Sequence, residues 1–310
     1  MKHGIGAVVN TLDGALGKEF NVGDAVIWYE VLKREPGAPT IVYLHGNSTN
    51  HTAFNHQRSH FHKMGSASLA PDQRGDGKST LLPSKSAYTL EAHVSDLEKL
   101  VEAEGIKRAT IVGHSKGAMV AQAYAAKHSD AVDAIVLIAG SYNFEESFKR
   151  SPLRKVLFEL APYMDTSRIY NMVAGLFVHN RENYYADFSS EKFRRISDLG
   201  FVLEIFGKST TEYVKVMQVV GAAVLNWDTK ESVAGINTPT LIINGEMDQL
   251  VPPKTAFELQ EMIPGAKHFE PVIIPGARHG VHFQAPEQVT AAMEKFLAGE
   301  IYSGRLMHKV

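Results

Sequence analysis

The stretch TIVGHSKGA, residues 110–118, decides the fold. An apolar run of strand length, residues 110–112, leads into it, and a run rich in small residues, 118–126, follows with the composition of a helix. The motif G-x-S-x-G between a strand and a helix predicts a nucleophile elbow, a tight turn that presents Ser115 above a sheet. Glycines two positions on either side keep such a turn free of clashes. On the five-residue motif alone, a serine that merely caps the helix fits equally well.

Two later loops supply the partners that a serine nucleophile needs. A serine hydroxyl attacks only when a base takes its proton and an acid holds that base, and the order on this kind of sheet is Ser, acid, His. Asp248 follows the strand pattern 241–243, and His279 follows the strand pattern ending at Ile274. Taken singly, Asp248 could cap a helix and His279 could be a surface histidine. Their order and loop positions together favour a Ser115–His279–Asp248 triad.

Backbone amides complete the expected site. An oxyanion hole needs the amide after the nucleophile, here that of Lys116, and a second amide from another loop. The loop His45-Gly46-Asn47 follows the strand pattern 40–44, which predicts the Asn47 amide in that role. The loop 72–79 ends in Gly77-Lys78-Ser79 but has Asp72 where a phosphate-binding P-loop needs glycine. We therefore expect this loop to be a turn that braces the site.

Strand and helix patterns alternate through the first 140 residues, which predicts a parallel sheet covered by helices. The helix pattern 90–101 repeats apolar residues at intervals of three and four and stops at Gly105. Residues 25–32 and 40–44 are rich in β-branched and aromatic residues and predict two strands, with a turn at Pro36-Gly37 between them. Residues 66–70, 110–112 and 134–139 are compact apolar runs of the kind found in buried parallel strands.

From Ser141 to Glu231 the sequence has no strand patterns, and short amphipathic helices are expected, including 191–196 and 211–225. Strand patterns return at 240–243 and 271–274, and a closing helix is expected over 286–297. We therefore predict a core domain made of residues 1–140 and 232–310, with residues 141–231 inserted as a helical cap.

Composition excludes several classes of function. The chain has 310 residues, 32 basic against 34 acidic side chains and no cysteine. A net charge of -2 argues against a nucleic-acid partner, and the missing cysteines exclude disulfides, thiol catalysis and thiolate-bound metals. The apolar runs are shorter than the roughly 20 residues of a membrane span, and charges interrupt the first twenty residues. These features favour a soluble, cytoplasmic protein; they give no oligomeric state and no role for residues 299–310.

These motifs together resemble the α/β-hydrolase superfamily, in its capped serine-hydrolase branch. The similarity rests on the elbow, the His45-Gly46 pair, the D-x-R-G-x-G-x-S stretch 72–79 and the two late loops, and extends from about residue 25 to 297. It implies a mostly parallel central sheet flanked by helices with an inserted helical cap. It also implies Ser115 as nucleophile, His279 as base and Asp248 as acid.

The resemblance narrows the activity. Epoxide hydrolases and haloalkane dehalogenases of the superfamily carry an aspartate nucleophile, which Ser115 excludes. The sequence HGNST at 45–49 also differs from the H-G-G-P-G of proline iminopeptidases and the H-G-x-G-P-G of many C–C bond hydrolases. We expect a carboxylic ester hydrolase that acts through an acyl-enzyme, without cofactor or metal, on small to medium apolar substrates. Phe144 and Trp227, at the departure and return of the insertion, are expected to line the substrate pocket.

Two other functions stay open. A C–C bond hydrolase or lactonase would use the same triad, and a ligand receptor or scaffold could keep the fold without turnover.

Several histidines raise a separate question. His56 and His60 are four residues apart and would share a helix face, as a metal pair does. No carboxylate lies within residues 50–64, so a solvated helix face is the default interpretation. The side chains of His114 and Lys116, which flank the serine, are expected to face neighbouring loops.

Overall fold

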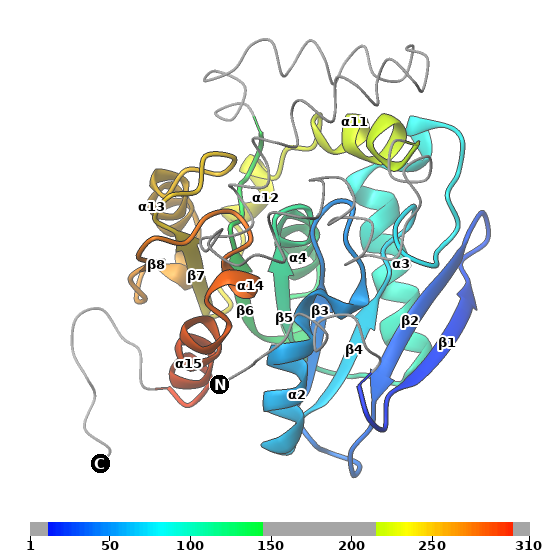
Figure 1. The fold of residues 1–310 in the computed structure, drawn as a ribbon, viewed down its shortest axis with the longest axis horizontal. Coiled ribbons are helices and arrows are strands. Elements are labelled where there is room, and N and C mark those ends of the chain that lie inside the picture. The colour runs from blue at the N-terminus through cyan, green and yellow to red at the C-terminus, as the bar shows by residue number, and fades with distance from the viewer. Residues whose placement is uncertain (1–11, 145–214, 300–310) are drawn as a thin grey trace, which may run out of the picture.

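The computed structural model describes residues 12–144 and 215–299, which form an eight-stranded sheet covered by helices on both faces (Figure 1). The strand order is β1-β2-β4-β3-β5-β6-β7-β8. The pairs β1–β2 and β2–β4 are antiparallel, and all pairs from β4 to β8 are parallel. The strands are β1 (Leu16–Asn21), β2 (Val26–Leu32), β3 (Thr40–Leu44), β4 (Ala67–Pro71), β5 (Ala109–His114), β6 (Val132–Ile138), β7 (Thr240–Gly245) and β8 (Val272–Ile274).

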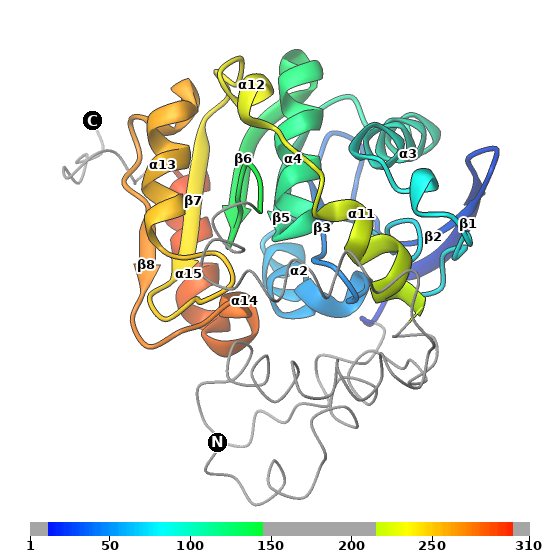
Figure 2. The ribbon, with the colours of Figure 1, turned by 90° about the horizontal axis from the view of Figure 1, so that it is seen from above.

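Helices α3, α4, α12 and α13 cover one face of the sheet, and α2 and α15 cover the other (Figure 2). Each face has its own hydrophobic core, because the central parallel strands are apolar on both sides. The longer helices are α2 (Asn55–Lys63), α3 (Leu90–Ala103), α4 (Lys116–Lys127), α13 (Lys254–Met262) and α15 (Pro286–Leu297). Short helices are η1 (His51–Phe54), η2 (Lys85–Ala87), η3 (Ser129–Ala131), η5 (Met217–Gly221), α11 (Ala222–Val224), α12 (Lys230–Val233), η6 (Pro264–Ala266) and α14 (Val281–Gln284).

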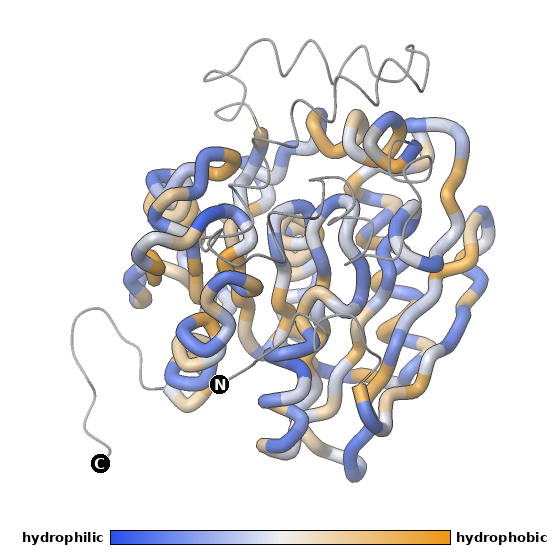
Figure 3. Tube along the Cα trace, viewed as in Figure 1, coloured by the Kyte–Doolittle hydropathy of each residue, from blue (hydrophilic) through white to orange (hydrophobic). Residues whose placement is uncertain are grey.

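Helix α2 differs from the other sheet-covering helices in being hydrophilic along most of its length (Figure 3). It still buries Asn55, Gln57, Arg58 and Phe61. Polar side chains can be buried when they are hydrogen-bonded, and Arg58 forms an ion pair with Glu30 of β2.

The predicted fold class is confirmed. All seven predicted strands are present, and the closing helix begins at Pro286 as expected. Strand β1 was not predicted. Its sequence LGKEFN has four exposed and two partly buried residues along the edge of the sheet, so it lacks the apolar run that marks a buried strand.

The predicted cap lies mostly outside the described residues. Residues 145–214, including the predicted helix 191–196, are not described, and neither are residues 1–11 and 300–310. The predicted helix 211–225 is helical from residue 215 to 224 in the part that is described. Within residues 12–144 and 215–299, no helix combines the length and hydrophobicity needed to span a bilayer.

Candidate active site

Ser115 lies in the sharp turn between β5 and α4. Its backbone has φ 51° and ψ −113°, a conformation that is costly for a residue with a side chain and persists only where its surroundings hold it. The flanking glycines allow the turn. A Cβ on Gly113 would lie 2.4 Å from the Gly117 carbonyl oxygen, and a Cβ on Gly117 would lie 2.1 Å from the Leu44 carbonyl oxygen. The predicted strand–turn–helix context is therefore confirmed.

The structure brings Ser115, His279 and Asp248 together. The Ser115 Oγ atom is 3.0 Å from His279 Nε2, and His279 Nδ1 is 2.8 Å from Asp248 Oδ2. All three side chains are buried. Because Asp248 can only accept when ionised, the hydrogen-bond network assigns the imidazole proton to Nδ1 and leaves Nε2 to accept from the serine hydroxyl. The serine, the base and the acid thus form one hydrogen-bonded chain.

The Asp248 carboxylate contacts both His279 and its own loop, and it does not cap α13, whose N-cap is Pro253. One carboxylate oxygen faces His279, while the other accepts the backbone N–H groups of Leu250 and Val251 at 2.8 and 2.9 Å. Three donors therefore fix this carboxylate. Glu246, two residues earlier, instead accepts the backbone N–H of Gly276.

His114, the residue before the serine, faces the loop that carries His279. Its Nε2 donates to the His279 carbonyl oxygen at 3.0 Å, and its ring centroid is 4.2 Å from that of His282. Burial lowers the pKa of His114 well below 6.5 and that of His282 to about 3, so both rings are neutral near pH 7. The prediction that His114 faces a neighbouring loop is confirmed.

The loop after β3 lies against the elbow. A Cβ on Gly46 would lie 2.5 Å from His114 Nδ1 and 3.5 Å from Ser115 Cβ, so only glycine permits this approach. His45 holds the start of the loop, since its Nε2 accepts the backbone N–H of Gln73 and its Nδ1 donates to the Gly46 carbonyl oxygen. Burial lowers the pKa of His45 to about 4, which keeps Nε2 free to accept. Asn47, half-buried, follows directly and stays the predicted second oxyanion donor.

The turn 72–79 braces this loop, as predicted. Asp72 accepts from the backbone N–H of His51 at 2.7 Å and from that of Lys78 at 2.8 Å. Asp76 accepts from the backbone N–H of Ser48 at 3.1 Å and from Lys116 Nζ at 2.6 Å. The Lys116 side chain therefore faces this turn, as its sequence position suggested.

The two residues expected to line the pocket are both buried, beside the described ends of the insertion. Trp227 donates its indole N–H to the Tyr88 carbonyl oxygen at 3.0 Å, and its ring meets His93 edge-on. These contacts place Trp227 against the start of α3. Contact of Trp227 or Phe144 with a substrate stays a prediction.

His56 and His60 share a face of α2, but this face packs on α15 and is not simply solvated. His56 Nδ1 is 3.2 Å from Thr290 Oγ1, and His60 Nε2 is 3.2 Å from Glu294 Oε2. Glu294 belongs to α15, more than 200 residues away, so no local sequence pattern indicates this pairing. Within residues 12–144 and 215–299, no group of three or more His, Asp and Glu side chains is arranged to hold a metal ion.

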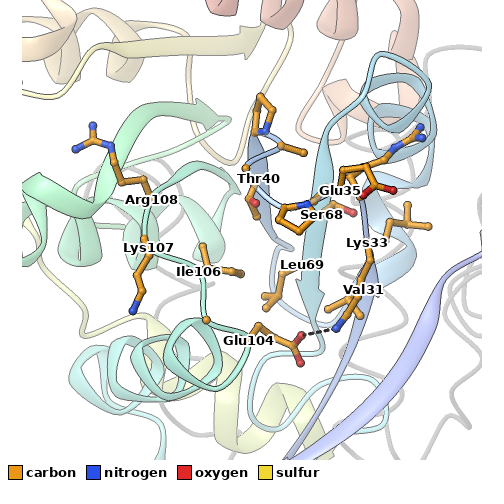
Figure 4. Close-up of a pocket in the computed structure, with 18 of the residues that line it drawn as sticks. Val31, Lys33, Glu35, Thr40, Ser68, Leu69, Glu104, Ile106, Lys107 and Arg108 are labelled. Atoms are coloured by element: carbon orange, nitrogen blue, oxygen red, sulfur yellow. Dashed lines mark ion pairs between the residues drawn. The ribbon is translucent and has the colours of Figure 1, made fainter.

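A cavity of about 450 Å³ lies at the amino-terminal ends of β3, β4 and β5, at the end of the sheet opposite Ser115 (Figure 4). Charged side chains line it in pairs: Arg108 with Asp133 at 2.6 Å, and Lys33 with Glu104 at 3.8 Å. The triad lies at the other end of the sheet, where Ser115 follows β5, Asp248 follows β7 and His279 follows β8. Sheets of this kind place their sites at that end. We therefore take the triad, and not this cavity, as the candidate active site.

The chain is similar in sequence to proteins of one family of hydrolases. The model of the alpha/beta hydrolase fold family matches residues 39–286. A protein of Caulobacter described as a carbamate hydrolase, RutD, is 31% identical over 230 residues, covering 74% of this chain and 80% of its own. Epoxide hydrolase A of Mycobacterium tuberculosis is 26% identical over 309 residues, covering 86% and 92%. Other relatives are named as an esterase/perhydrolase and a lipase.

Solved structures show the same fold. The α/β hydrolase MGS-M2, from a deep-sea metagenome library of the Medee basin, superposes with a TM-score of 0.73 at 24% identity, covering 94% of this chain and all of that one.

Proposed function

The chain belongs to the α/β hydrolase family, and on that premise we propose that it is a serine hydrolase that cleaves carboxylic esters through an acyl-enzyme. The observation that carries this proposal is the hydrogen-bonded chain from Ser115 through His279 to Asp248, with distances of 3.0 and 2.8 Å. A serine in a strained turn, next to an imidazole held by a carboxylate, is the arrangement that activates a hydroxyl as a nucleophile.

In the proposed first step, Ser115 Oγ attacks the ester carbonyl carbon while its proton passes to His279 Nε2. Asp248 stabilises the imidazolium that forms and keeps the ring oriented. The carbonyl oxygen becomes an oxyanion, for which we propose the backbone N–H groups of Asn47 and Lys116 as donors. Lys116 is the first residue of α4, so its backbone N–H lies at the N-terminus of this helix, directly after the nucleophile.

In the following steps, the tetrahedral intermediate collapses and the C–O bond to the alcohol breaks. His279 returns the proton to the departing alkoxide, which leaves the acyl group on Ser115. Water then enters, His279 takes its proton, and the hydroxide attacks the acyl carbon. The acid is released and Ser115 regains its proton, so the cycle needs no cofactor.

The nucleophile separates this proposal from epoxide opening. The epoxide hydrolases of this superfamily use an aspartate nucleophile, and this chain has Ser115 at the elbow. The match to epoxide hydrolase A therefore supports the family and not that activity. Relatives named as esterases and lipases support an ester substrate.

Carbamate cleavage is a second candidate, favoured by the 31% identity to RutD. A carbamate carbonyl carries one oxygen and one nitrogen substituent, so the same attack by Ser115 and the same oxyanion donors would serve. A carbamate can lose its alkoxide, which leaves a carbamoyl group on Ser115, or its amine, which His279 would have to protonate as it departs.

We further propose that residues 141–231 form the predicted helical cap above the site, with Phe144 and Trp227 facing an apolar pocket. Both side chains are 6% exposed, which is consistent with an enclosed position. Each buried methylene adds about 0.8 kcal/mol of transfer free energy, so kcat/KM should climb with acyl length until the pocket fills.

A substrate panel tests this function. Purified protein is given p-nitrophenyl esters from acetate to decanoate, p-nitrophenyl carbamates, a lactone and a C–C cleavage substrate, with Ser115→Ala as the control for background hydrolysis. The proposal expects the highest kcat/KM on an ester and none above background in the control. Turnover of the C–C substrate or the lactone alone would replace the ester assignment. Binding without turnover of any substrate would instead favour a ligand receptor.

A further inference from the structure

A buried ion pair joins the turn after β4 to the first residue of α4. Lys116 Nζ lies 2.6 Å from Asp76 Oδ2, and both side chains are fully buried. Lys116 directly follows the proposed nucleophile, so the pair is anchored one residue from Ser115. Such a pair is weak evidence for stability, because an apolar pair of the same shape often stabilises a protein as well or better.

The second oxygen of Asp76 holds the loop after β3. Asp76 Oδ1 accepts the backbone N–H of Ser48 at 3.1 Å. Ser48 has φ 61°, in the left-handed region that is unfavourable for a residue with a side chain unless its surroundings fix it. The Ser48 amide belongs to the peptide that follows Asn47. One carboxylate therefore holds both backbone segments that carry the proposed oxyanion donors.

We propose that Asp76 is a positioning residue which, together with the Lys116 side chain, fixes the amides of Asn47 and Lys116 relative to each other. This inference rests on the serine-hydrolase function proposed above. An oxyanion hole works only when its donors lie about 2.7–3.1 Å from the place where the charge develops. Without Asp76, the backbone at Ser48 can relax toward negative φ and turn the peptide next to Asn47.

A second buried ion pair provides the matched control. Arg58 and Glu30 are also fully buried, at 2.7 Å. Arg58 has further hydrogen bonds to Asn55 and Ser68, which lie on α2 and β4 and not on the loop 45–49. Replacing this pair therefore tests what the loss of a buried ion pair does to the protein in general.

The experiment compares two double variants, Asp76→Leu with Lys116→Met and Glu30→Leu with Arg58→Met. Both remove two opposite charges and keep similar volume, so neither leaves an unpaired buried charge. Lys116→Met also keeps the backbone amide. Each variant is measured for Tm, for kcat and KM on a p-nitrophenyl ester, and for the Ki of a boronic acid. A boronic acid forms an anionic tetrahedral adduct with the serine oxygen, and one of its boron-bound hydroxyl oxygens takes the place of the oxyanion.

The inference expects Asp76→Leu/Lys116→Met to lose about 10²-fold in kcat, as expected when an oxyanion donor is lost, and to weaken the boronic acid Ki by a similar factor. KM should stay close to that of the wild type, because ground-state binding does not use the hole. The Glu30→Leu/Arg58→Met variant should keep kcat and Ki even if its Tm changes. The single variant Lys116→Arg, which preserves the positive charge opposite Asp76, should keep most of the wild-type kcat.

Equal kcat and Ki in the two double variants would overturn the inference and leave the pair a structural role. If the Asp76→Leu/Lys116→Met variant does not fold, the boronic acid Ki is measured for the single variants Asp76→Asn and Lys116→Met. A wild-type Ki in both single variants would overturn the inference. A wild-type protein without ester turnover and without boronic acid binding would instead refute the proposed function, and this result is seen before any variant is compared.

Discussion

The Nε2 atom of His114 lies 3.0 Å from the carbonyl oxygen of His279, 165 residues further along the chain. The residue before the proposed nucleophile thus holds the backbone of the proposed base. Because the His114 ring is buried and its pKa lies well below 6.5, this hydrogen bond is made by a neutral imidazole at physiological pH.

Replacing His114 with Ala should therefore lower kcat. A hydrogen bond contributes about 0.5–1.5 kcal/mol, which corresponds to a loss of up to about tenfold in rate if it orients His279. His128→Ala is the control, since His128 is half-exposed and pairs with Glu98 away from the triad. Steady-state kinetics on one ester checks both variants, and equal kcat in the two would mean that the contact does not orient the base.

Asp248→Asn should reduce kcat by about 10⁴-fold, because the amide can hold the imidazole in the wrong tautomer. Glu246→Gln should change kcat little, since Glu246 accepts a hydrogen bond from Gly276 and not from the histidine. Both rates can be measured on the same ester at pH 7.5. A strong loss in Glu246→Gln, with wild-type activity in Asp248→Asn, would move the acid to Glu246.

Gly117→Ala should be severely destabilising. Its new Cβ would lie 2.1 Å from the backbone oxygen of Leu44, which a rotamer change cannot relieve. Overpacking of this kind costs about 3 kcal/mol or more. At Gly235 the nearest heavy atom would be 3.5 Å away, so Gly235→Ala should fold normally. Urea unfolding compares the two variants, and equal midpoints would show that the elbow has room for a side chain.

Acid should destabilise the protein well before its carboxylates titrate. Burial lowers the pKa of His45 to about 4 and of His282 to about 3, and those of His93 and His114 also fall well below 6.5. Below about pH 6.5 the unfolded chain therefore binds more protons than the folded one, so stability falls as the pH falls toward 4 and is fully present above 6.5.

Each such histidine contributes a slope of about 1.4 kcal/mol per pH unit in this window. Urea unfolding at pH 7.5, 6.5, 5.5 and 5.0 measures that slope. His282→Phe should make this slope shallower, because it removes one of the buried ionisable rings. A phenyl ring should fit in its place, since His282 stacks on Phe54 in the core. Stability that does not change between pH 7.5 and 5.0 would contradict the burial of these rings as neutral groups.

The sequence predicted the central strands because each is a compact apolar run buried on both faces. It also placed Ser115, Asp248 and His279 on loops at one edge of the sheet, since the order of parallel strands fixes where their ends meet. Strand β1 was not predicted, because edge strands carry polar residues and glycine, such as Gly17 and Lys18, and their sequence resembles that of a loop.

The supporting contacts could not be predicted, because they join side chains far apart in sequence. Lys116 and Asp76 are 40 residues apart, and no local period links them. His56 and His60 show the same limit, since their spacing suggested a shared face but not the Thr290 and Glu294 side chains opposite. Periodicity reports which face of an element is buried, whereas polar partners depend on tertiary packing.

Labelling with a fluorophosphonate identifies the residue that acts as the nucleophile. An activated serine displaces fluoride and forms a covalent O–P bond, so the account predicts one added mass, on the peptide that contains Ser115. Ser115→Ala should take up no label and lose about six orders of magnitude in ester turnover, with an unchanged unfolding midpoint. A label on a different residue, or an active Ser115→Ala protein, would show that Ser115 is not the nucleophile.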